Sequence, residues 1–148
     1  MSVKNSTNLD SDDHRNLIIK LEANLNSTIL GQQDLICDII CSFLAEGHVL
    51  ITGAPGLAKT TIVKSFASYL GLQFGRVQFT PDLLPTDITG SDILNIDSET
   101  NRRYFEFVKG PIFCNILLAD EINRSAPKTQ SALLESMQER TVTYGGLS

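Results

Sequence analysis

The chain has 148 residues, 42% hydrophobic and 20% charged, a composition that excludes a disordered, collagen-like or coiled-coil chain. Twelve basic against 17 acidic residues give a net charge of −5, which argues against a uniformly basic nucleic-acid-binding protein. No apolar stretch approaches the roughly 20 residues that span a bilayer, and the polar N-terminus lacks the apolar centre of a secretory signal. We therefore expect a cytoplasmic protein without a membrane span.

The N-terminal part of the chain is expected to hold a tail and two helices. Residues 1–13 are rich in Ser, Asn and Asp, which predicts a disordered tail. Apolar residues at helical spacing then predict one helix that ends before Gly31 and a second over about 32–46. The residues at helical spacing in the first helix are Leu17, Ile18, Leu21 and Leu25. The predicted apolar face of the second consists of Leu35, Ile36, Ile39, Ile40 and Phe43.

The middle of the chain alternates between strand and helix signals. The apolar run 48–52 is bounded by glycines and predicts a buried parallel strand. A Gly/Pro loop, a helix over 59–70 and a strand over about 73–79 follow, which together make a βαβ unit. The predicted buried face of this helix consists of Ile62, Val63, Phe66, Ala67 and Leu70.

The C-terminal half predicts a hairpin, another strand and another helix. A structured loop or broken helix is expected over 80–90, followed by strands over 93–96 and 102–108 around a turn at 97–101. A strand over 116–119, a helix to about 139 and a strand over 141–144 come next. The predicted buried face of this helix is Leu133, Leu134 and Met137. Strands that alternate with helices predict an α/β fold with a parallel sheet.

Three cysteines, Cys37, Cys41 and Cys114, fit neither a zinc-binding spacing nor a CxxC redox motif. Cys37 and Cys41 are four residues apart and are expected on one face of a helix. We interpret all three as small buried side chains in a reducing cytoplasm.

The strongest chemical signal is a glycine-rich segment between the strand 48–52 and the following helix, the context that a phosphate-binding P-loop requires. Its backbone N–H groups and the helix N-terminus can bind phosphate oxygens, Lys59 can reach the β- and γ-phosphates, and Thr60 can ligate Mg²⁺. The plainer alternative is a strand–turn–helix with an incidental lysine. The predicted phosphate-binding residues are Gly53, Ala54, Pro55, Gly56, Leu57, Ala58, Lys59, Thr60 and Thr61.

Ala58 stands where the common P-loop pattern has glycine before the lysine. Its N–H remains available, so alanine is acceptable there if the residue is already right-handed helical.

The second signal is the apolar strand 116–119 followed by two acids. Asp120 is expected to hold Mg²⁺ through water, and Glu121 to orient and deprotonate the attacking water. Because the carboxyl ends of parallel strands converge, Lys59 and Asp120 are expected at one site, and Glu121 favours hydrolysis of the nucleotide.

Two other patterns are interpreted as incidental. Asp87–Gly90 matches the DxxG motif of GTPases, but no apolar strand precedes it and no guanine-reading motif occurs. Arg102 and Arg103 lie beside three aromatic residues, which is a pattern of single-stranded nucleic-acid binding. The alternative, an alternating strand with one packed face, is favoured by the surrounding acids, so no nucleic-acid partner is expected.

Together these residues resemble the MoxR group of AAA+ ATPases. The resemblance covers about residues 28–146, and the stretch 76–90 is more specific than the P-loop. The matching stretches are 29–32, 47–60, 76–90, 110–113, 118–124, 127–135 and 137–140.

The resemblance implies a P-loop NTPase sheet of AAA+ type, flanked by helices, with a hairpin insertion at about 93–108 that faces a ring pore or client. Residues 14–148 would be the N-terminal portion of the ATPase domain, truncated before the fourth strand. Leu30 and Gly31 would contact adenine. ATP and Mg²⁺ are the implied cofactors.

Members of this group resemble assembly factors that form hexameric rings and act on partner proteins, often with von Willebrand factor A domains. The sensors, arginine finger and helical lid would lie beyond Ser148. The implied strand order 5-1-4-3-2 leaves a vacant position between 48–52 and 116–119, so the chain alone is expected to be unstable or aggregation-prone, with no ladder joining these two segments.

Three functions follow from these patterns. The leading one is ATP hydrolysis by a chaperone-like remodelling ATPase. The second is a nucleotide-binding interaction module that does not hydrolyse ATP, because the sensors, arginine finger and lid are missing. A P-loop kinase is disfavoured by Glu121 and by the absence of an arginine-rich lid.

Overall fold

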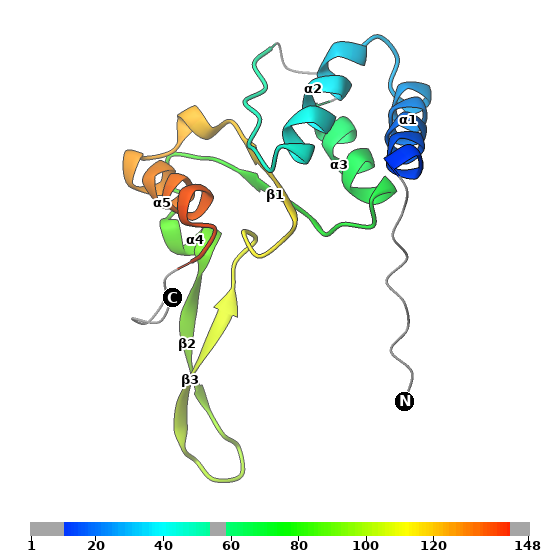
Figure 1. The fold of residues 1–148 in the computed structure, drawn as a ribbon. Helices are drawn as coiled ribbons and strands as arrows, with labels where there is room; N and C mark the ends of the chain where they lie inside the picture. Colours follow the sequence, from blue (N-terminus) through cyan, green and yellow to red (C-terminus); the bar gives the residue numbers. More distant parts are fainter. Residues whose placement is uncertain (1–10, 54–58, 143–148) are drawn as a thin grey trace, which may run out of the picture. The chain divides into compact units, whose positions relative to one another are not determined.

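The computed structural model describes residues 11–53 and 59–142, and Figure 1 shows their helices and strands. The chain divides into two compact units, Met1–Tyr69 and Leu70–Ser148, which are described separately. Predictions for residues 1–10, 54–58 and 143–148 lie outside the described residues. Among the described residues, no helix has the length and apolar character needed to cross a membrane.

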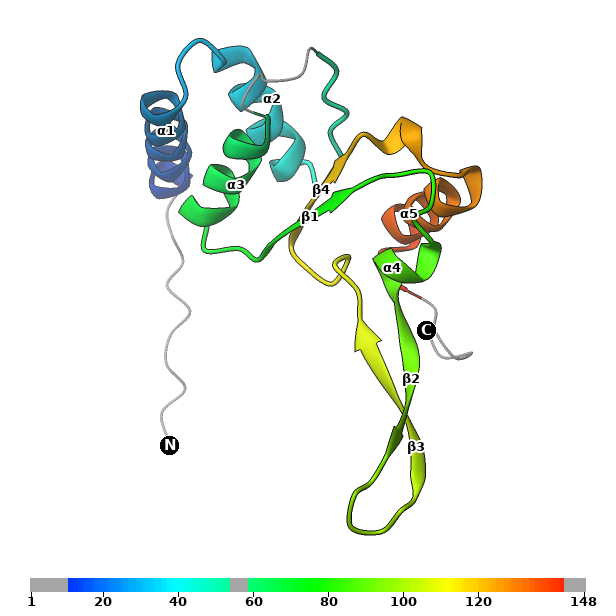
Figure 2. The same ribbon diagram turned by 180° about the vertical axis from the view of Figure 1, so that it is seen from behind.

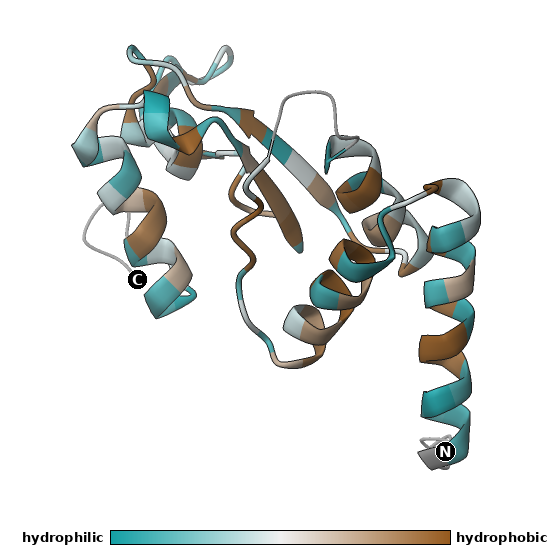
Figure 3. Ribbon diagram, turned by 90° about the horizontal axis from the view of Figure 1, so that it is seen from above, coloured by the Kyte–Doolittle hydropathy of each residue, from teal (hydrophilic) through white to brown (hydrophobic). Residues whose placement is uncertain are grey.

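The first unit contains three helices: α1 (Ser11–Thr28), α2 (Gln33–Leu44) and α3 (Lys59–Tyr69). α1 begins at Ser11, so residues 11–13, which were predicted to belong to the disordered tail, are helical. Asp12 and Asp13 lie in its first turn, where carboxylates interact favourably with the helix dipole. Figure 3 shows apolar turns between polar ones along α1. Of the residues at helical spacing, Leu25 is buried, whereas Leu17 is 54% exposed.

The core of the first unit forms where α2 and α3 present their apolar faces. Its buried residues on these helices are Ile36, Ile39, Ile40, Ile62, Val63, Phe66 and Ala67, all of them predicted. Phe43 packs edge-to-face on Phe66, with ring centroids 5.2 Å apart, while its outer side stays exposed. The predicted helical faces are thus confirmed, except that Phe43 and Leu70 lie at the rim.

The cysteine prediction is wrong for α2, because Cys37 and Cys41 are both exposed. The buried face of this helix runs through Ile36, Ile39 and Ile40. Each cysteine follows a buried isoleucine by one residue, a rotation of about 100° that carries its side chain out of the core. Cys114 is half-buried.

The segment 48–53 does not form the predicted strand. The described residues form two ladders, β1 with β4 and β2 with β3, and 48–53 belongs to neither. A strand requires a partner strand in a ladder, and no described strand pairs with this segment. Val49 and Leu50 are accordingly 42% and 81% exposed. The vacant strand position expected between 48–52 and 116–119 stays a prediction.

The second unit is built on a parallel pair of strands. β1 (Phe74–Gln78) pairs with β4 (Ile116–Asp120), and Gln78 lies opposite Asp120. In the implied order 5-1-4-3-2, the segment 73–79 is strand 2 and the segment 116–119 is strand 3. The pairing of β1 with β4 confirms that these two strands are neighbours. Figure 2 shows the same unit from behind.

Three short or medium helices complete this unit: α4 (Pro85–Thr89), the 3₁₀ turn η1 (Ile122–Arg124) and α5 (Pro127–Glu139). Its core is made by Val77, Phe79, Ile88 and Leu133, with Met137 packed against it. Leu134 is 56% exposed, so its predicted burial is wrong, because only one stripe of α5 faces the core. Thr141 and Val142 do not form the predicted strand; Thr143 and Tyr144 lie outside the described residues.

The DxxG-like segment has a structural role. Asp87 Oδ2 accepts a hydrogen bond of 2.8 Å from the Leu84 N–H and so caps the N-terminus of α4. The interpretation of this match as incidental is consistent with that contact.

The predicted hairpin is present and longer than expected. β2 (Gly90–Ile96) pairs antiparallel with β3 (Arg103–Lys109), and Figures 1 and 2 show it extending away from α4 and α5. Gly90 has φ +93°, and a Cβ there would lie 2.3 Å from the Val108 carbonyl oxygen. Only glycine fits this close approach at the base of the hairpin.

Candidate functional site

The predicted site residues fall into two groups, one in each unit, and each is described by itself. In the first unit, Lys59 begins α3 and its Nζ donates a hydrogen bond of 2.9 Å to the Gly53 carbonyl. This contact joins the two described residues on either side of 54–58, and we call the pair Gly53 and Lys59 the mouth of the predicted loop. Ala54, Pro55, Gly56, Leu57 and Ala58 lie outside the described residues.

A hollow of about 240 Å³ lies beside this mouth. Its lining combines an ammonium, an amide and apolar side chains, which suits a ligand with an anionic part and a flat apolar part. An ammonium carries three donors, so Lys59 can keep its contact with Gly53 and still bind a phosphate oxygen. The lining residues are Gln32, Leu35, Leu50, Ile51, Thr52 and Lys59.

The predicted adenine-contacting residues lie in the turn between α1 and α2. Leu30 is 87% exposed, and Gly31 has φ +76°, a conformation that glycine adopts without strain. The next residue, Gln32, lines the hollow. Leu30 and Gly31 therefore precede a lining residue in the sequence but do not line the hollow themselves.

Thr60 and Thr61 occupy the first turn of α3, directly after Lys59. Thr60 is half-buried and Thr61 is exposed. The N-terminal turn of a helix has unpaired N–H groups, which is where a P-loop places its phosphate.

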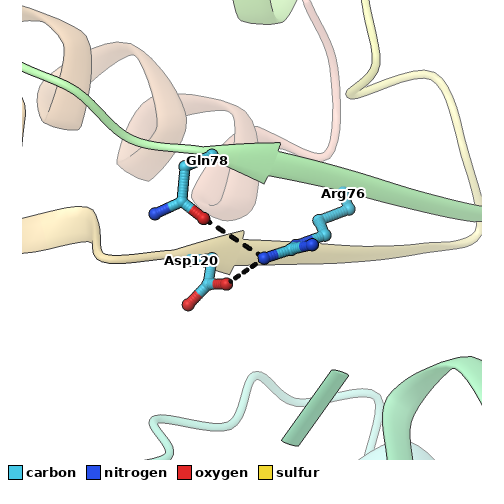
Figure 4. Close-up of polar contacts among 3 residues, drawn as sticks. All are labelled: Arg76, Gln78 and Asp120. Atoms are coloured by element: carbon cyan, nitrogen blue, oxygen red, sulfur yellow. Dashed lines mark hydrogen bonds and ion pairs between the residues drawn. The ribbon is translucent and has the colours of Figure 1, made fainter. Parts of the chain in front are cut away.

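In the second unit, β4 ends at Asp120, and its carboxylate is held by an arginine. Arg76 Nη2 lies 2.7 Å from Asp120 Oδ2 and donates a second hydrogen bond of 3.2 Å to Gln78 Oε1 (Figure 4). The side chains of Arg76 and Asp120 are 46% and 32% exposed. The predicted metal ligand is thus engaged by a cationic side chain from the neighbouring strand.

Glu121 has a left-handed backbone, with φ 57° and ψ 40°. This conformation is uncommon for a residue with a side chain and costs roughly 1 kcal/mol or more. Glu121 lies between the end of β4 and the start of η1. The chain therefore turns at the residue that carries the predicted catalytic carboxylate. Backbone strain of this kind is concentrated at functional sites.

The start of α5 fixes the segment that follows Glu121. Gln130 Nε2 donates to the carbonyls of Ile122 and Ser125, at 3.1 and 3.0 Å. Buried Thr129 donates from Oγ1 to the Leu83 carbonyl at 2.7 Å. These contacts tie the turn after Glu121 and the loop before α4 to one helix.

The donor set fits Mg²⁺ bound together with a nucleotide. Mg²⁺ prefers oxygen ligands and is usually held by one or two carboxylates, water and substrate phosphates. Within 11–53 and 59–142, no three His, Cys, Asp or Glu residues gather as a metal site of their own. The sequence predicts Asp120 and the Thr60 hydroxyl as ligands, and each supplies an oxygen of the kind that Mg²⁺ prefers.

Three residues of the site were missed by the sequence analysis: Arg76, Gln78 and Gln130. Arg76 and Gln78 are two residues apart in a strand expected to be buried, so they share one face. Two polar residues on one face of such a strand, next to the strand that carries Asp120, are the signal that could have found them.

The comparisons with known proteins identify the family. Residues 48–148 match the model of the ATPase family associated with various cellular activities (AAA). The protein YeaC of Bacillus subtilis, itself uncharacterized, is 46% identical over 135 residues, which cover 91% of this chain and 41% of YeaC. Chaperone MoxR1 of Mycobacterium tuberculosis is 51% identical over 118 residues, covering 80% of this chain and 30% of MoxR1.

A solved structure is also similar. The crystal structure of a "putative ATPase" from Cytophaga hutchinsonii superposes with a TM-score of 0.76 at 45% identity, and the match covers 89% of this chain and 39% of that one. The chain therefore spans about a third to two fifths of the relatives that it matches.

The fold and the matched region define an α/β ATPase domain with a parallel sheet. The chain belongs to the AAA family of ATPases, and the resemblance to the MoxR group is confirmed.

Proposed function

We propose that this protein binds Mg·ATP and hydrolyses ATP. The observation that carries the proposal is the contact of 2.9 Å between Lys59 Nζ and the Gly53 carbonyl, beside a hollow of about 240 Å³, in a chain of the AAA family. This contact supports a phosphate-binding loop over Gly53–Thr61, with Lys59 as the cation that meets the phosphates.

The remaining roles are assigned to residues of both units. Asp120 and Thr60 would hold Mg²⁺, which supplies electrostatic stabilisation to the phosphates when bound. Glu121 would act as the general base and orient the attacking water. Its left-handed backbone supports this role, because backbone strain of this kind is concentrated at functional sites. Leu30 and Gly31 would contact the adenine.

We further propose that ATP turnover drives remodelling or assembly of partner proteins, within a ring hexamer in the cytoplasm. The support is the similarity to Chaperone MoxR1. Partners with von Willebrand factor A domains are part of this proposal, and nucleic acid is not.

The test is phosphate release from ATP, measured together with binding of Mg·ATP. Glu121→Gln should keep binding within about threefold of wild type and lower turnover by about 10²-fold or more, because the metal ligand remains and only the base is lost. Glu135→Gln removes an exposed carboxylate from α5 and is the matched control; it should keep turnover.

Turnover of Glu121→Gln at the wild-type rate would contradict the assigned base. Binding of Mg·ATP by the wild type without any turnover would favour the alternative function, a nucleotide-binding interaction module.

A further inference from the structure

We propose that Arg76 regulates the access of the divalent cation to Asp120. Its guanidinium binds the carboxylate at 2.7 Å and competes with the cation for it. The inference rests on the proposed function, because it takes Asp120 as a metal ligand. It adds a positioning residue from β1 to the site.

The contact is fixed by the strand register. Gln78 lies opposite Asp120 in the β1–β4 ladder, and Arg76 is two residues earlier on the same face of β1. One nitrogen, Nη2, bridges Asp120 Oδ2 at 2.7 Å and Gln78 Oε1 at 3.2 Å (Figure 4). Gln78 therefore holds the guanidinium beside the carboxylate, and the hydrogen-bonded ladder holds both strands in place.

Simultaneous binding of the guanidinium and a divalent cation to this carboxylate is unfavourable. Both are positively charged, and both use the lone pairs of the same carboxylate. Mg²⁺ also needs near-ideal octahedral geometry, with water or phosphate around it, which a guanidinium at 2.7 Å obstructs. The Arg76–Asp120 contact therefore opposes binding of the cation at Asp120.

The contact is weak enough to be displaced. Both side chains are partly exposed, at 46% and 32%. Measured ion pairs of this kind correspond to changes of up to about fivefold in an equilibrium constant. Arg76 is therefore expected to lower the apparent affinity for the cation by about two- to fivefold.

The experiment measures the affinity for ATP as a function of Mg²⁺ concentration, by fluorescence of a labelled nucleotide. Arg76→Gln should reach half of the Mg²⁺-dependent gain in affinity at about two- to fivefold less Mg²⁺ than wild type. Arg76→Lys keeps the charge and should stay closer to wild type. Arg103→Gln removes the same charge from the exposed strand β3 and should change nothing.

Two results overturn the proposal. One is an unchanged Mg²⁺ dependence in Arg76→Gln; the other is an equal shift in Arg103→Gln, which would indicate a general charge effect. ATP binding by wild type with an unchanged Mg²⁺ dependence in Arg76→Gln contradicts only the role of Arg76. Absence of ATP binding in wild type contradicts the proposed function, and this inference with it.

A second measurement covers the case in which Arg76→Gln does not fold. NMR of wild-type protein with ¹⁵N-labelled arginine should show a rotationally restricted Arg76 guanidinium without ligand, and Mg·ATP should release it. ATP without Mg²⁺ should leave the restriction in place. A guanidinium that rotates freely without ligand, or stays restricted with Mg·ATP, overturns the proposal.

Discussion

The thiols of Cys37 and Cys41 lie exposed and one turn apart on α2, and Cys41 affects the pKa of Cys37. The pKa of Cys37 is raised, first by its hydrogen bond with Cys41 and then by the charge of Cys41; slight burial and the charges of Glu22 and Asp38 add to the shift. Alkylation requires the thiolate, so a raised pKa slows it near neutral pH. Exposure alone therefore overestimates the reactivity of Cys37.

We predict that Cys41→Ala accelerates alkylation of Cys37 by iodoacetamide at pH 8. The variant removes both the hydrogen bond and the neighbouring charge, so the pKa of Cys37 falls and more thiolate is present. Site-resolved mass spectrometry gives the rate. Cys114→Ala is the control, because Cys114 lies in the second unit and should not affect Cys37. An equal or slower rate in Cys41→Ala would show that the pair is not coupled.

The sequence was informative about the site wherever chemistry is carried by residue type and spacing. Lys59, Asp120 and Glu121 were candidates because their types follow particular strand and loop patterns. Two properties had no such signal: the left-handed backbone of Glu121 and the pairing of Arg76 with Asp120. The first depends on how the chain leaves β4, and the second on which strand lies beside β4.

Among the elements, the β2–β3 hairpin shows how a turn is encoded in sequence. Asp97 Oδ1 accepts hydrogen bonds from the N–H groups of Glu99 and Thr100, at 2.9 and 2.8 Å. Its pKa is lowered, first by the backbone N–H of Thr100, then by the Thr100 side chain and the Glu99 N–H. The ionised carboxylate is therefore what orders the turn.

We predict that acid loosens this turn through Asp97. Because the folded-state pKa is lowered, the stabilisation is present above the ordinary pKa, about 3.9, and is lost as the pH falls through the lowered value. In wild type, the amides of Glu99 and Thr100 should be more strongly protected from exchange above that pH range than below it. Asp97→Ala should abolish this difference, whereas Glu99→Gln should retain it. A pH response that survives in Asp97→Ala would contradict this role.

Elements with local signals were predicted well. The helices α2, α3 and α5 have apolar residues at helical spacing, and the hairpin has strands around a polar turn. The strand expected at 48–52 failed for a different reason: its sequence is suited to a strand, but a strand also needs a hydrogen-bonded neighbour, which sequence patterns do not supply. Cys37 and Cys41 failed because burial depends on a rotation of about 100° per residue around α2.

At the scale of the whole molecule, the family match covers most of this chain, whereas the chain covers less than half of each relative. The AAA model matches residues 48–148, and the chain corresponds to 30% of MoxR1 and 41% of YeaC. The parallel pairing of β1 with β4 is the part of the predicted strand order that the structure confirms.

The most direct test of the central claim is isothermal titration calorimetry of Mg·ATP into wild type and Lys59→Ala. Wild type should bind with one saturable site per chain. Lys59→Ala should lose detectable binding, because the phosphates lose their main cation at the mouth of the loop. Lys64→Ala, which removes an exposed lysine farther along α3, should bind like wild type. Equal affinity in wild type and Lys59→Ala would contradict the assignment of a phosphate-binding loop.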